Sequence, residues 1–459
     1  MDRMATGISA LDNILDGGFP KGSTILLVGK PGSGKTIFAH QMMYHNASFD
    51  QKVVYLTTLA ESQMKVLKFQ QEFDFFDKSK FQREVIYNDL GSVLRKHGPK
   101  HALQVIEELL KKYEPALIIV DTIKTISDII PSLLEFREFI LDLSNRLATW
   151  DCTSLLLGEY SEEDIEIRPE SSIADGIVYL SGAEEEKYQK RYLRILKMRG
   201  TGFAGGQNVF TISKNGLEVF PRLNPVASQQ VYEQFSEKIT TGLPELDVLT
   251  FGGLTRASTT LLSGSSGSGK TILALHFIYG GLQSGENAVY VSFEENQQQI
   301  ARSAQKLGID LQPYIDQGKL KLIHLSPIEL DVDIHVFEIQ KMVVNYNAKR
   351  LVIDSISSFE IGMENKVKYT DYIWAITDFF KTQGVTVLLT HELHETDTFS
   401  KLTKHGISFV ADNLILLRYI EEGLDVKRFL RVVKMRGSQH SSLLSELRIE
   451  NSRLKIGKG

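Results

Sequence analysis

Two segments of the chain match the phosphate-binding loop pattern G-x-x-x-x-G-K-[ST]: residues 29–36 read GKPGSGKT and residues 264–271 read GSSGSGKT. Each follows an apolar stretch typical of a buried strand and precedes a helical pattern. In such a loop, backbone N–H groups surround the β-phosphate, the lysine neutralises phosphate oxygens, and the threonine hydroxyl is offered to Mg²⁺. A chance glycine-rich turn does not explain two complete copies in the same context. The pattern therefore predicts two sites for ATP or GTP with Mg²⁺.

The residues predicted to bind the nucleotide are the loop glycines, serines, lysines and threonines. They are Gly29, Gly32, Ser33, Gly34, Lys35 and Thr36 in the first copy, and Gly264, Gly267, Ser268, Gly269, Lys270 and Thr271 in the second. The two threonines are also predicted ligands of Mg²⁺.

The two loops belong to a duplicated domain. The two loop lysines are 235 positions apart (270 − 35 = 235), and TG, LD and GG pairs before each loop recur at the same spacing. Further on, PALIIVDT matches KRLVIDS, and LRILKMRG matches LRVVKMRG, with shifts of two residues. We therefore predict two domains, residues 1–222 and 237–459. The linker is expected at 223–236, where Asn224 and Pro225 interrupt any regular pattern.

The order of elements predicts an α/β fold. In both halves short apolar strands, such as 117–120 and 322–325, alternate with amphipathic segments such as 102–112. Continuous apolar strands between helices indicate a mostly parallel sheet flanked by helices. Each half ends in strand-like runs broken by turns, which indicate an antiparallel extension of the sheet.

Composition narrows the class of protein. The net charge of −5 and the pI near 6.2 argue against a strongly basic nucleic-acid-binding domain. Cys152 is the only cysteine, so no intrachain disulfide is possible, and a reducing cytoplasm is the expected location. No signal peptide and no apolar run of the roughly 20 residues that span a bilayer are found. We expect a soluble, cytoplasmic protein without a membrane partner.

Asp121 and Asp354 each end an apolar run and precede Thr or Ser. An acid at the end of a buried strand beside the phosphate loop is the expected place of the carboxylate that organises Mg²⁺. A lone aspartate at a strand end is more often a cap or turn former. Because both stand in register with a phosphate loop, the metal role is favoured.

A pair of acids distinguishes the second half from the first. There the apolar run AVYVSF leads into Glu294 and Glu295, and one of them is predicted to be a general base or to position water. Glu294 is also a candidate for Mg²⁺. With one inserted residue, the first half places Ala60 opposite Glu294 and Glu61 opposite Glu295, so Glu61 is its remaining catalytic candidate. The alternative is a solvated helix start, since acids favour helix N-termini.

The tetrapeptide KMRG occurs in both halves. It contains Lys197 and Arg199 in the first half, and Lys434 and Arg436 in the second. Alternate residues of a strand point to the same face, so both charges of each pair project together. A solvated strand edge is the alternative. Two identical copies favour cations that reach the γ-phosphate of a neighbouring subunit.

These motifs together, TG-x-x-x-LD, GG, GKT, FEE, VIDS and KMRG, resemble the KaiC family of tandem RecA-like ATPases over essentially the whole chain. The resemblance implies two RecA-like P-loop NTPase domains, a double-ring homohexamer with ATP between subunits, and autokinase and autophosphatase activity in the second ring. It assigns Glu294 as the catalytic glutamate there, and the two KMRG pairs as trans-acting cations. It also implies a KaiB-like or other signalling protein as a partner.

Ser408 is the predicted phosphoacceptor. The family's adjacent Ser-Thr pair corresponds here to Ser408 and Phe409, so a two-site phosphorylation cycle is excluded. The alternative is a turn or cap hydroxyl. The chain also ends at Gly459, so we expect it to lack the family's long C-terminal tail.

A second class of function stays open. RecA-like cores also occur in recombinases and helicase-like motors that act on nucleic acid, and fold does not decide function. The acidic balance and the lack of an aromatic-basic stripe favour the self-phosphorylating ATPase.

Overall fold

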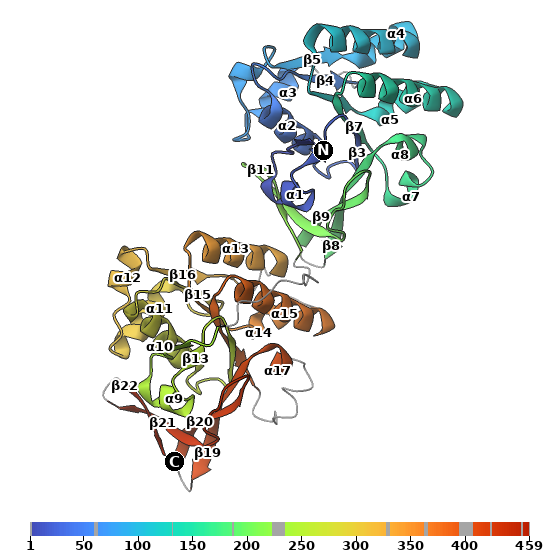
Figure 1. Cartoon of the computed structure of the whole chain (residues 1–459). Coiled ribbons are helices and arrows are strands. Elements are labelled where there is room, and N and C mark those ends of the chain that lie inside the picture. The colour runs from blue at the N-terminus through green and yellow to red at the C-terminus, as the bar shows by residue number, and fades with distance from the viewer. Residues whose placement is uncertain are drawn as a thin grey trace. The chain divides into compact units, whose positions relative to one another are not determined.

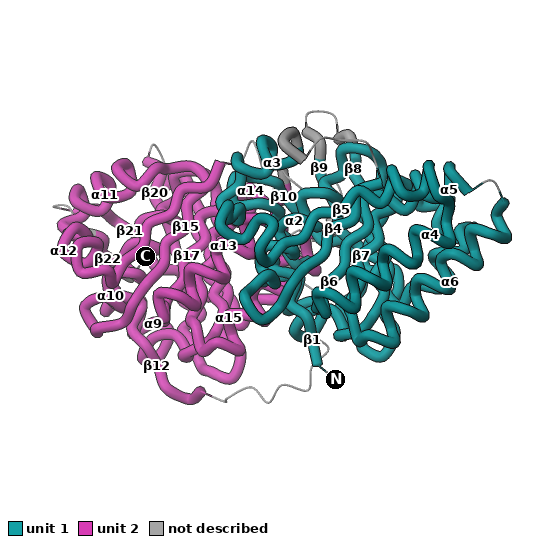
Figure 2. The backbone as a smooth tube through the Cα atoms, turned by 90° about the horizontal axis from the view of Figure 1, so that it is seen from above, with its two compact units in different colours: residues 1–222 teal, residues 223–459 magenta. Residues whose placement is uncertain are grey.

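The computed structural model describes residues 2–58, 63–130, 132–185, 188–222, 235–326, 331–361, 366–393, 407–422, 425–450 and 453–458. The chain forms two compact units, residues 1–222 and 223–459 (Figure 2). Each unit contains a nine-stranded sheet and a small two-stranded sheet. The sequence duplication therefore corresponds to a duplicated fold.

The large sheet of the first unit has the order β11-β10-β9-β8-β3-β7-β6-β4-β5 (Figure 1). The strands of this unit are β1 (Arg3–Met4), β2 (Phe19–Pro20), β3 (Thr24–Gly29), β4 (Val53–Thr57), β5 (Val85–Asp89), β6 (Leu117–Asp121), β7 (Thr153–Gly158), β8 (Gly176–Glu185), β9 (Tyr188–Met198), β10 (Asn208–Ser213) and β11 (Gly216–Phe220). Within this order β8, β3, β7, β6, β4 and β5 pair in parallel with one another, and β9, β10 and β11 continue the sheet antiparallel from β8.

The second unit repeats this topology in the order β16-β15-β17-β18-β14-β19-β20-β21-β22. Its strands are β12 (Lys238–Ile239), β13 (Leu254–Thr255), β14 (Thr259–Gly264), β15 (Ala288–Ser292), β16 (Leu320–His324), β17 (Arg350–Asp354), β18 (Thr386–Glu392), β19 (Asn413–Glu422), β20 (Asp425–Met435), β21 (Ser445–Glu450) and β22 (Arg453–Lys458). The predicted α/β class, with a mostly parallel sheet and an antiparallel extension, is confirmed.

Helices lie on both faces of each sheet. In the first unit they are α1 (Ser9–Ile14), α2 (Lys35–Asn46), α3 (Gln63–Gln70), α4 (Leu90–Tyr113), α5 (Ile123–Ile129), α6 (Leu133–Thr149), α7 (Glu162–Ile165) and α8 (Pro169–Ile173). In the second they are α9 (Pro244–Leu249), α10 (Lys270–Gln283), α11 (Gln297–Lys306), α12 (Gln312–Asp316), α13 (Val332–Asn345), α14 (Ser357–Ile361), α15 (Lys366–Thr382) and α17 (Ile407–Val410).

The apolar strands divide their side chains between two cores. In β14, Leu262 packs in the cluster that includes α10, while its neighbour Leu261 packs in the cluster that includes α13 and α15. Successive residues of a strand point to opposite faces, so a strand buried on both sides must be apolar throughout. The first unit follows the same plan, and α4 and α6 pack beside each other over one face (Figure 1). This packing fixes the carboxyl ends of the parallel strands, where each phosphate loop begins.

Some predicted boundaries were wrong. The strand expected at 322–325 is β16, which begins at Leu320 and includes Lys321. The ammonium of Lys321 lies 5.9 Å from the centre of the Tyr346 ring. Because a charged residue interrupts the apolar pattern, the sequence placed the start of this strand too late. Helix α4 begins well before the expected 102–112, because the Asp89 side chain caps its first turn and the helix continues past a break at Gly98 (φ 78°). No helix among the described residues is long and apolar enough to cross a membrane.

Candidate nucleotide-binding sites

The glycine-rich loops connect β3 to α2 and β14 to α10. The residues just before these helices, Gly34 and Gly269, have φ of 98° and 109°, a left-handed conformation that other residues rarely adopt. The Oγ atoms of Ser33 and Ser268 are buried and have no hydrogen-bond partner among the described residues. A helix N-terminus with backbone N–H groups and the positive end of its dipole favours an anion. Both loops therefore fit a phosphate group.

The loop lysines fold back onto their own loops. Nζ of Lys35 donates to the carbonyl oxygens of Gly29 (2.9 Å) and Lys30 (3.0 Å), and Nζ of Lys270 does the same with Gly264 (2.8 Å) and Ser265 (2.9 Å). Burial lowers the pKa of both lysines, and nearby carboxylates oppose this effect. Each ammonium is thus held at the loop, where it can neutralise phosphate oxygens.

Each predicted metal-organising aspartate lies beside the threonine of its loop. Asp354 accepts a hydrogen bond from Thr271 Oγ1 at 2.8 Å and from Tyr290 Oη at 2.7 Å. Its other carboxylate oxygen accepts from Thr390 Oγ1. The strand ends therefore bring the predicted Thr–Asp pair of the second site together. The sequence alone did not reveal that Tyr290 and Thr390 donate hydrogen bonds to Asp354.

The first site has the same pair with fewer hydroxyl groups around it. Asp121 Oδ2 accepts from Thr36 Oγ1 at 3.2 Å and from Tyr55 Oη at 2.6 Å. Burial is the largest influence on this carboxyl and raises its pKa, against the two hydrogen bonds and the charge of Lys35. Tyr55 is 235 residues before Tyr290, so the repeat was the signal that could have identified both tyrosines.

The residues present fit Mg²⁺ through oxygen ligands. A threonine hydroxyl and a carboxylate oxygen meet at each loop, and Mg²⁺ is commonly held by one or two such groups together with phosphate oxygens and waters. Among the described residues there is no cluster of three or more His, Cys, Asp or Glu side chains that could hold a metal alone. The donor set is that of a shared protein–phosphate site.

The two acids of the second site directly follow β15. The backbone N–H groups of Glu294 and Glu295 point to Ser292 Oγ, at 3.3 and 2.9 Å, and Ser292 pairs with Asp354 on the neighbouring strand. Burial raises the pKa of both glutamates, and the charge of Asp354 raises it further. The structure therefore brings the acid pair to the mouth of the second site and makes both groups better bases.

The corresponding candidate of the first site, Glu61, lies outside the described residues, as does Ala60. The sheet register is known up to that point: Thr57 pairs with Asp121 as Ser292 pairs with Asp354. The inserted residue of the predicted alignment would therefore have to follow the strand β4.

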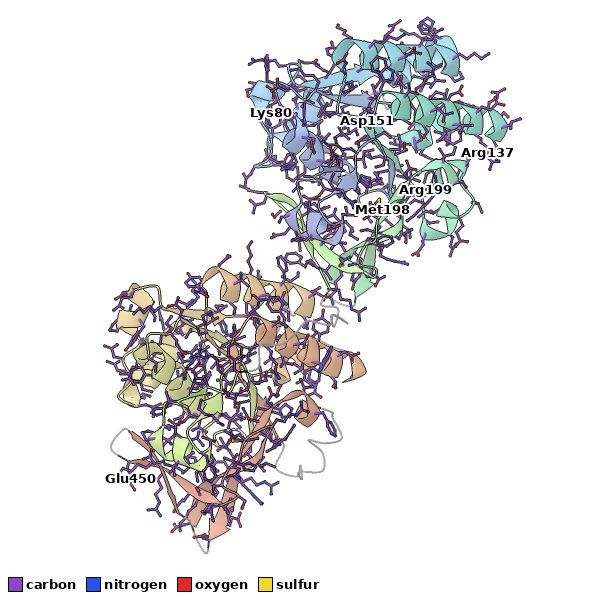
Figure 3. All side chains as sticks on the ribbon, in the orientation of Figure 1. Lys80, Arg137, Asp151, Met198, Arg199 and Glu450 are labelled. Carbon is purple, nitrogen blue, oxygen red and sulfur yellow. The ribbon has the colours of Figure 1, made fainter. Side chains whose placement is uncertain are left out.

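The KMRG cations lie at the other end of the sheet from the loop of their own domain. Met198 lies just before Arg199 (Figure 3) and pairs with Gly176. The carboxylate of the preceding residue, Asp175, accepts from the N–H of Thr24 at the start of β3. The phosphate loop begins at the other end of β3. At about 3.3 Å per residue, that strand separates the two by on the order of 17 Å. The cations therefore cannot serve the nucleotide site of their own domain.

Backbone carbonyls hold the cations of each pair. Lys197 Nζ donates to the carbonyl of Ser171 (3.1 Å), and Arg199 Nη2 to that of Ser172 (3.4 Å). In the second domain Lys434 Nζ donates to Ala411 O (2.8 Å) and Arg436 Nη2 to Phe409 O (2.7 Å). Both arginines are exposed. Each pair is thus presented at an edge that a neighbouring molecule can reach.

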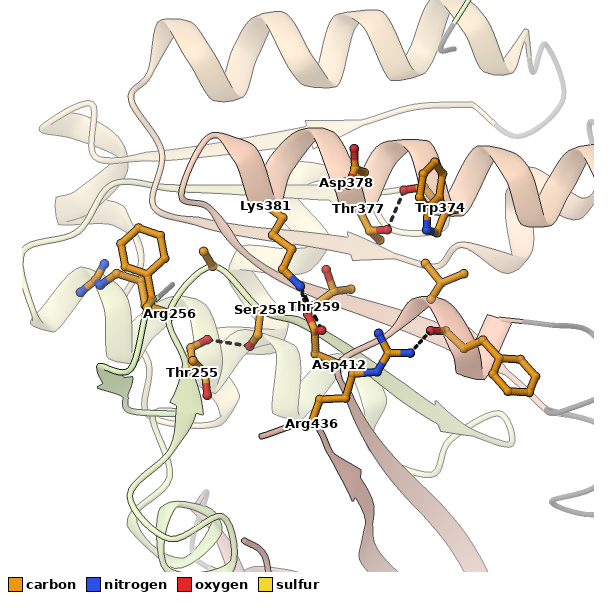
Figure 4. Close-up of a pocket in the computed structure, with 14 residues that line it drawn as sticks. Thr255, Arg256, Ser258, Thr259, Trp374, Thr377, Asp378, Lys381, Asp412 and Arg436 are labelled. Atoms are coloured by element: carbon orange, nitrogen blue, oxygen red, sulfur yellow. Dashed lines mark hydrogen bonds and ion pairs between the residues drawn. The ribbon is translucent and has the colours of Figure 1, made fainter. Parts of the chain in front are cut away.

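A cavity of about 530 Å³ lies beside the second pair and is lined by Arg436, Asp412, Lys381 and Trp374, among other residues (Figure 4). Asp412 organises this region. Its carboxylate binds Lys381 Nζ (3.0 Å) and the N–H of Thr259, and its carbonyl accepts from the Arg436 N–H. Asp175 has the same backbone contacts in the first domain. Neither aspartate was identified from the sequence, although they recur in the repeat.

Ser408 lies in the short helix α17, and its side chain is outside the described part of the chain. The next residue, Phe409, is 64% exposed, and its carbonyl oxygen accepts from Arg436. The structure thus places the backbone of the predicted phosphoacceptor next to the second cation pair.

Comparison with known proteins agrees with this arrangement. A family model described as KaiC ATPase matches residues 4–224 and again residues 239–459. The circadian clock protein KaiC3 of a Synechocystis species is 28% identical over 471 aligned positions, which cover 100% of this chain and 92% of the relative. The circadian clock oscillator protein KaiC of Parathermosynechococcus lividus is 28% identical, covering 98% and 84%. That of Thermostichus vulcanus is 27% identical, covering 97% and 87%. With two matched RecA-like domains that span nearly its whole length, the chain belongs to the KaiC family of ATPases.

Proposed function

We propose that the protein binds ATP with Mg²⁺ in both domains, hydrolyses it, and phosphorylates itself on Ser408 from the second site. The single observation that carries this division is the acid pair, Glu294 and Glu295, which lies beside Asp354 and has raised pKa values. In the first domain Ala60 replaces one acid of the predicted pair. The second site is therefore better equipped for phosphoryl transfer, and the first for slow hydrolysis.

The chemistry follows from the positions of these groups. Lys270 and the loop N–H groups would hold the phosphates, and Thr271 with Asp354 would hold Mg²⁺. The metal, when bound, neutralises charge on the phosphate oxygens. Glu294 would accept the proton of a water or of a serine hydroxyl while the oxygen of that water or hydroxyl attacks the γ-phosphorus. The bond to the bridging oxygen breaks, and ADP leaves with that electron pair.

Phosphoryl transfer to Ser408 and the role of the cations both imply a second copy. The KMRG pairs and α17 lie at the end of the sheet opposite the loops, so a neighbouring subunit would supply the nucleotide site that they face. We propose a homohexamer, because head-to-tail contacts of this kind can close into a ring and the family resemblance implies six subunits. A phosphoserine would add nearly two negative charges at that interface and change how the ring packs.

The names of the relatives are those of circadian clock proteins. We propose that this chain likewise works as a timing or signalling protein in the cytoplasm. Its nucleotide and phosphorylation state would set the binding of a KaiB-like or other signalling protein.

Two loop variants test the division of labour. Lys270→Ala should abolish phosphate incorporation into the protein and leave hydrolysis by the first site, whereas Lys35→Ala should remove first-site hydrolysis and weaken the hexamer. The measurements are ATP turnover, intact mass after incubation with Mg-ATP, and mass by light scattering. Ser408→Ala is the control for the modified residue, and its protein should still hydrolyse ATP.

Equal loss of hydrolysis in both variants, together with no phosphate on the unmodified protein, would contradict the proposal. DNA-stimulated hydrolysis that falls steeply with salt would favour a nucleic-acid motor instead.

A further inference from the structure

In both domains a glutamate stands at the carboxyl end of the strand that lies between the loop strand and the aspartate strand. In the second domain Glu392 is the last residue of β18 and pairs in register with Gly264, the first residue of the phosphate loop. In the first domain Val28 pairs with Gly158, so Glu159 comes next to the loop's Gly29. The two glutamates are 233 positions apart, the spacing that also separates Asp121 and Asp354. The repeat has therefore kept an acid at one place of the phosphate site.

We propose that this glutamate is part of the hydrolytic site, and that Glu159 orients the attacking water in the first domain. The inference deepens the proposed ATPase function and rests on it. It assigns Glu159 the work that Glu294 is proposed to do in the second domain.

Both glutamates lie one strand from the loop residue that holds the lysine. The strand register sets Glu159 beside Gly29, whose carbonyl oxygen accepts from Lys35 Nζ at 2.9 Å. Glu392 pairs with Gly264, whose carbonyl oxygen accepts from Lys270 Nζ at 2.8 Å. The backbone of each glutamate therefore lies at the start of the phosphate loop, next to the residue that binds the lysine.

Both glutamates are exposed at the mouth of the site, while the aspartate beside them is hydrogen-bonded to hydroxyl groups. Neighbouring backbone contacts hold the Glu392 segment: Leu393 N–H donates to Gly264 O at 3.1 Å and Glu392 N–H to Ser357 Oγ at 2.8 Å. Glu392 thus has a fixed main chain, and both glutamates have a side chain open to the solvent from which water enters.

The proposed step is hydrolysis. The water oxygen forms a bond to the γ-phosphorus while its proton passes to the Glu159 carboxylate, and the bond between that phosphorus and the bridging oxygen breaks. ADP leaves with the electron pair, and the proton is later released to solvent. In the second domain Glu294 and Glu295 are present as well, so Glu392 is expected to matter less.

The test uses the full chain with Lys270→Ala, which leaves the first site as the source of hydrolysis. Adding Glu159→Gln should lower kcat about 100-fold, because general base catalysis typically contributes at least that much to the rate. The KM for ATP should change little. Binding of a fluorescent ATP analogue should be retained, and formate should partly restore turnover to Glu159→Ala. Glu108→Gln, an exposed change on α4, is the matched control and should leave turnover unchanged.

The same experiment separates this inference from the proposed function. If the Lys270→Ala protein hydrolyses ATP and Glu159→Gln does not slow it, while Glu61→Gln does, the assignment of Glu159 is wrong and the ATPase function stands. If the Lys270→Ala protein binds ATP without hydrolysing it, hydrolysis in the first domain and the role of Glu159 are both wrong. In the Lys35→Ala background, Glu392→Gln should lower kcat less than tenfold, and Glu294→Gln should lower it about 100-fold.

Discussion

Asp354 of the second domain and Asp121 of the first occupy the same place in the two sheets but have different neighbours. In the second domain the hydroxyl of Thr390 donates to the aspartate. In the first, Leu157 is the residue that pairs with Asp121, so an apolar side chain takes that position. The loops and the threonine–aspartate pairs have stayed the same, while the residues one strand away have changed. The duplication thus kept the residues proposed to hold phosphate and metal and varied the hydrogen bonding of the aspartate.

A second difference lies in the helix that follows each loop. His40 of α2 is 6% exposed, its ring centre lies 5.1 Å from that of Tyr55, and its Nε2 has no hydrogen-bond partner among the described residues. Leu275 stands at the matching position of α10 and is fully buried. The first domain therefore has a titratable group under its nucleotide site where the second has an apolar one.

The largest expected effect concerns the cations at the far end of the sheet. Arg436→Ala should lower second-site activity about 1,000-fold, since an arginine acting in trans contributes at least that much to phosphoryl transfer. Mixing the Arg436→Ala and Lys270→Ala proteins should restore part of the activity, because one subunit would offer an intact loop to the arginine of the other. Phosphate incorporation in the mixture is the measurement.

Arg256→Ala is the control for that mixture, because Arg256 lines the same cavity as Arg436 but is bound to Glu237 and Glu286. It should keep its activity alone, and mixing it with the Lys270→Ala protein should give no phosphate incorporation beyond the sum of the two proteins. An Arg436→Ala protein that stays inactive in every mixture would mean that the cation does not act across subunits. The phosphate loop and the KMRG pair would then have separate roles.

The next effect is on stability in acid. Burial lowers the pKa of His40 to about 3, against an ordinary value of 6.5. The unfolded chain therefore binds a proton between those values that the folded chain does not, and stability that is present above pH 6.5 is lost as the pH falls toward 3. Thermal unfolding should show a loss on the order of 1 kcal/mol per pH unit below pH 6.

His40→Leu, which copies the second domain, should remove much of this acid sensitivity. His97→Leu changes an exposed histidine of the same unit and is the control. The second domain has its own partly buried histidine, His276, whose pKa burial also lowers, so some acid sensitivity should persist. Identical acid unfolding of the His40→Leu protein and the parent would show that the buried imidazole is not its source.

The smallest effect should come from exchanging the residue beside the aspartate. Thr390→Val removes a hydroxyl that donates to Asp354 and should lower second-site activity by roughly tenfold, about the contribution of one hydrogen bond to a charged group. Leu157→Thr introduces a hydroxyl beside Asp121 and should change first-site turnover by less. Steady-state rates in the Lys35→Ala and Lys270→Ala backgrounds separate the sites. Unchanged rates in both backgrounds would show that this contact does not contribute to the difference between the two sites.

Much of the site could be predicted because its parts follow short local rules. Glycine at a left-handed position, a lysine one residue later and an acid at a strand end are each set by neighbours in the sequence, and the repeat confirmed their spacing. The partners across strands could not be predicted in this way. Tyr290 and Thr390 come from two other strands and meet Asp354 only when the sheet order is known.

The sequence by itself determined that this protein has two phosphate loops on duplicated α/β domains, since loop chemistry and strand burial leave their pattern in consecutive residues. Only the tertiary structure decided that each KMRG pair lies a full strand length from the loop of its own domain, and that Glu159 and Glu392 lie beside the first glycine of each loop. The reason is physical. The order and direction of strands bring distant residues together or keep them apart, and that order follows from how the whole sheet packs between its two layers of helices.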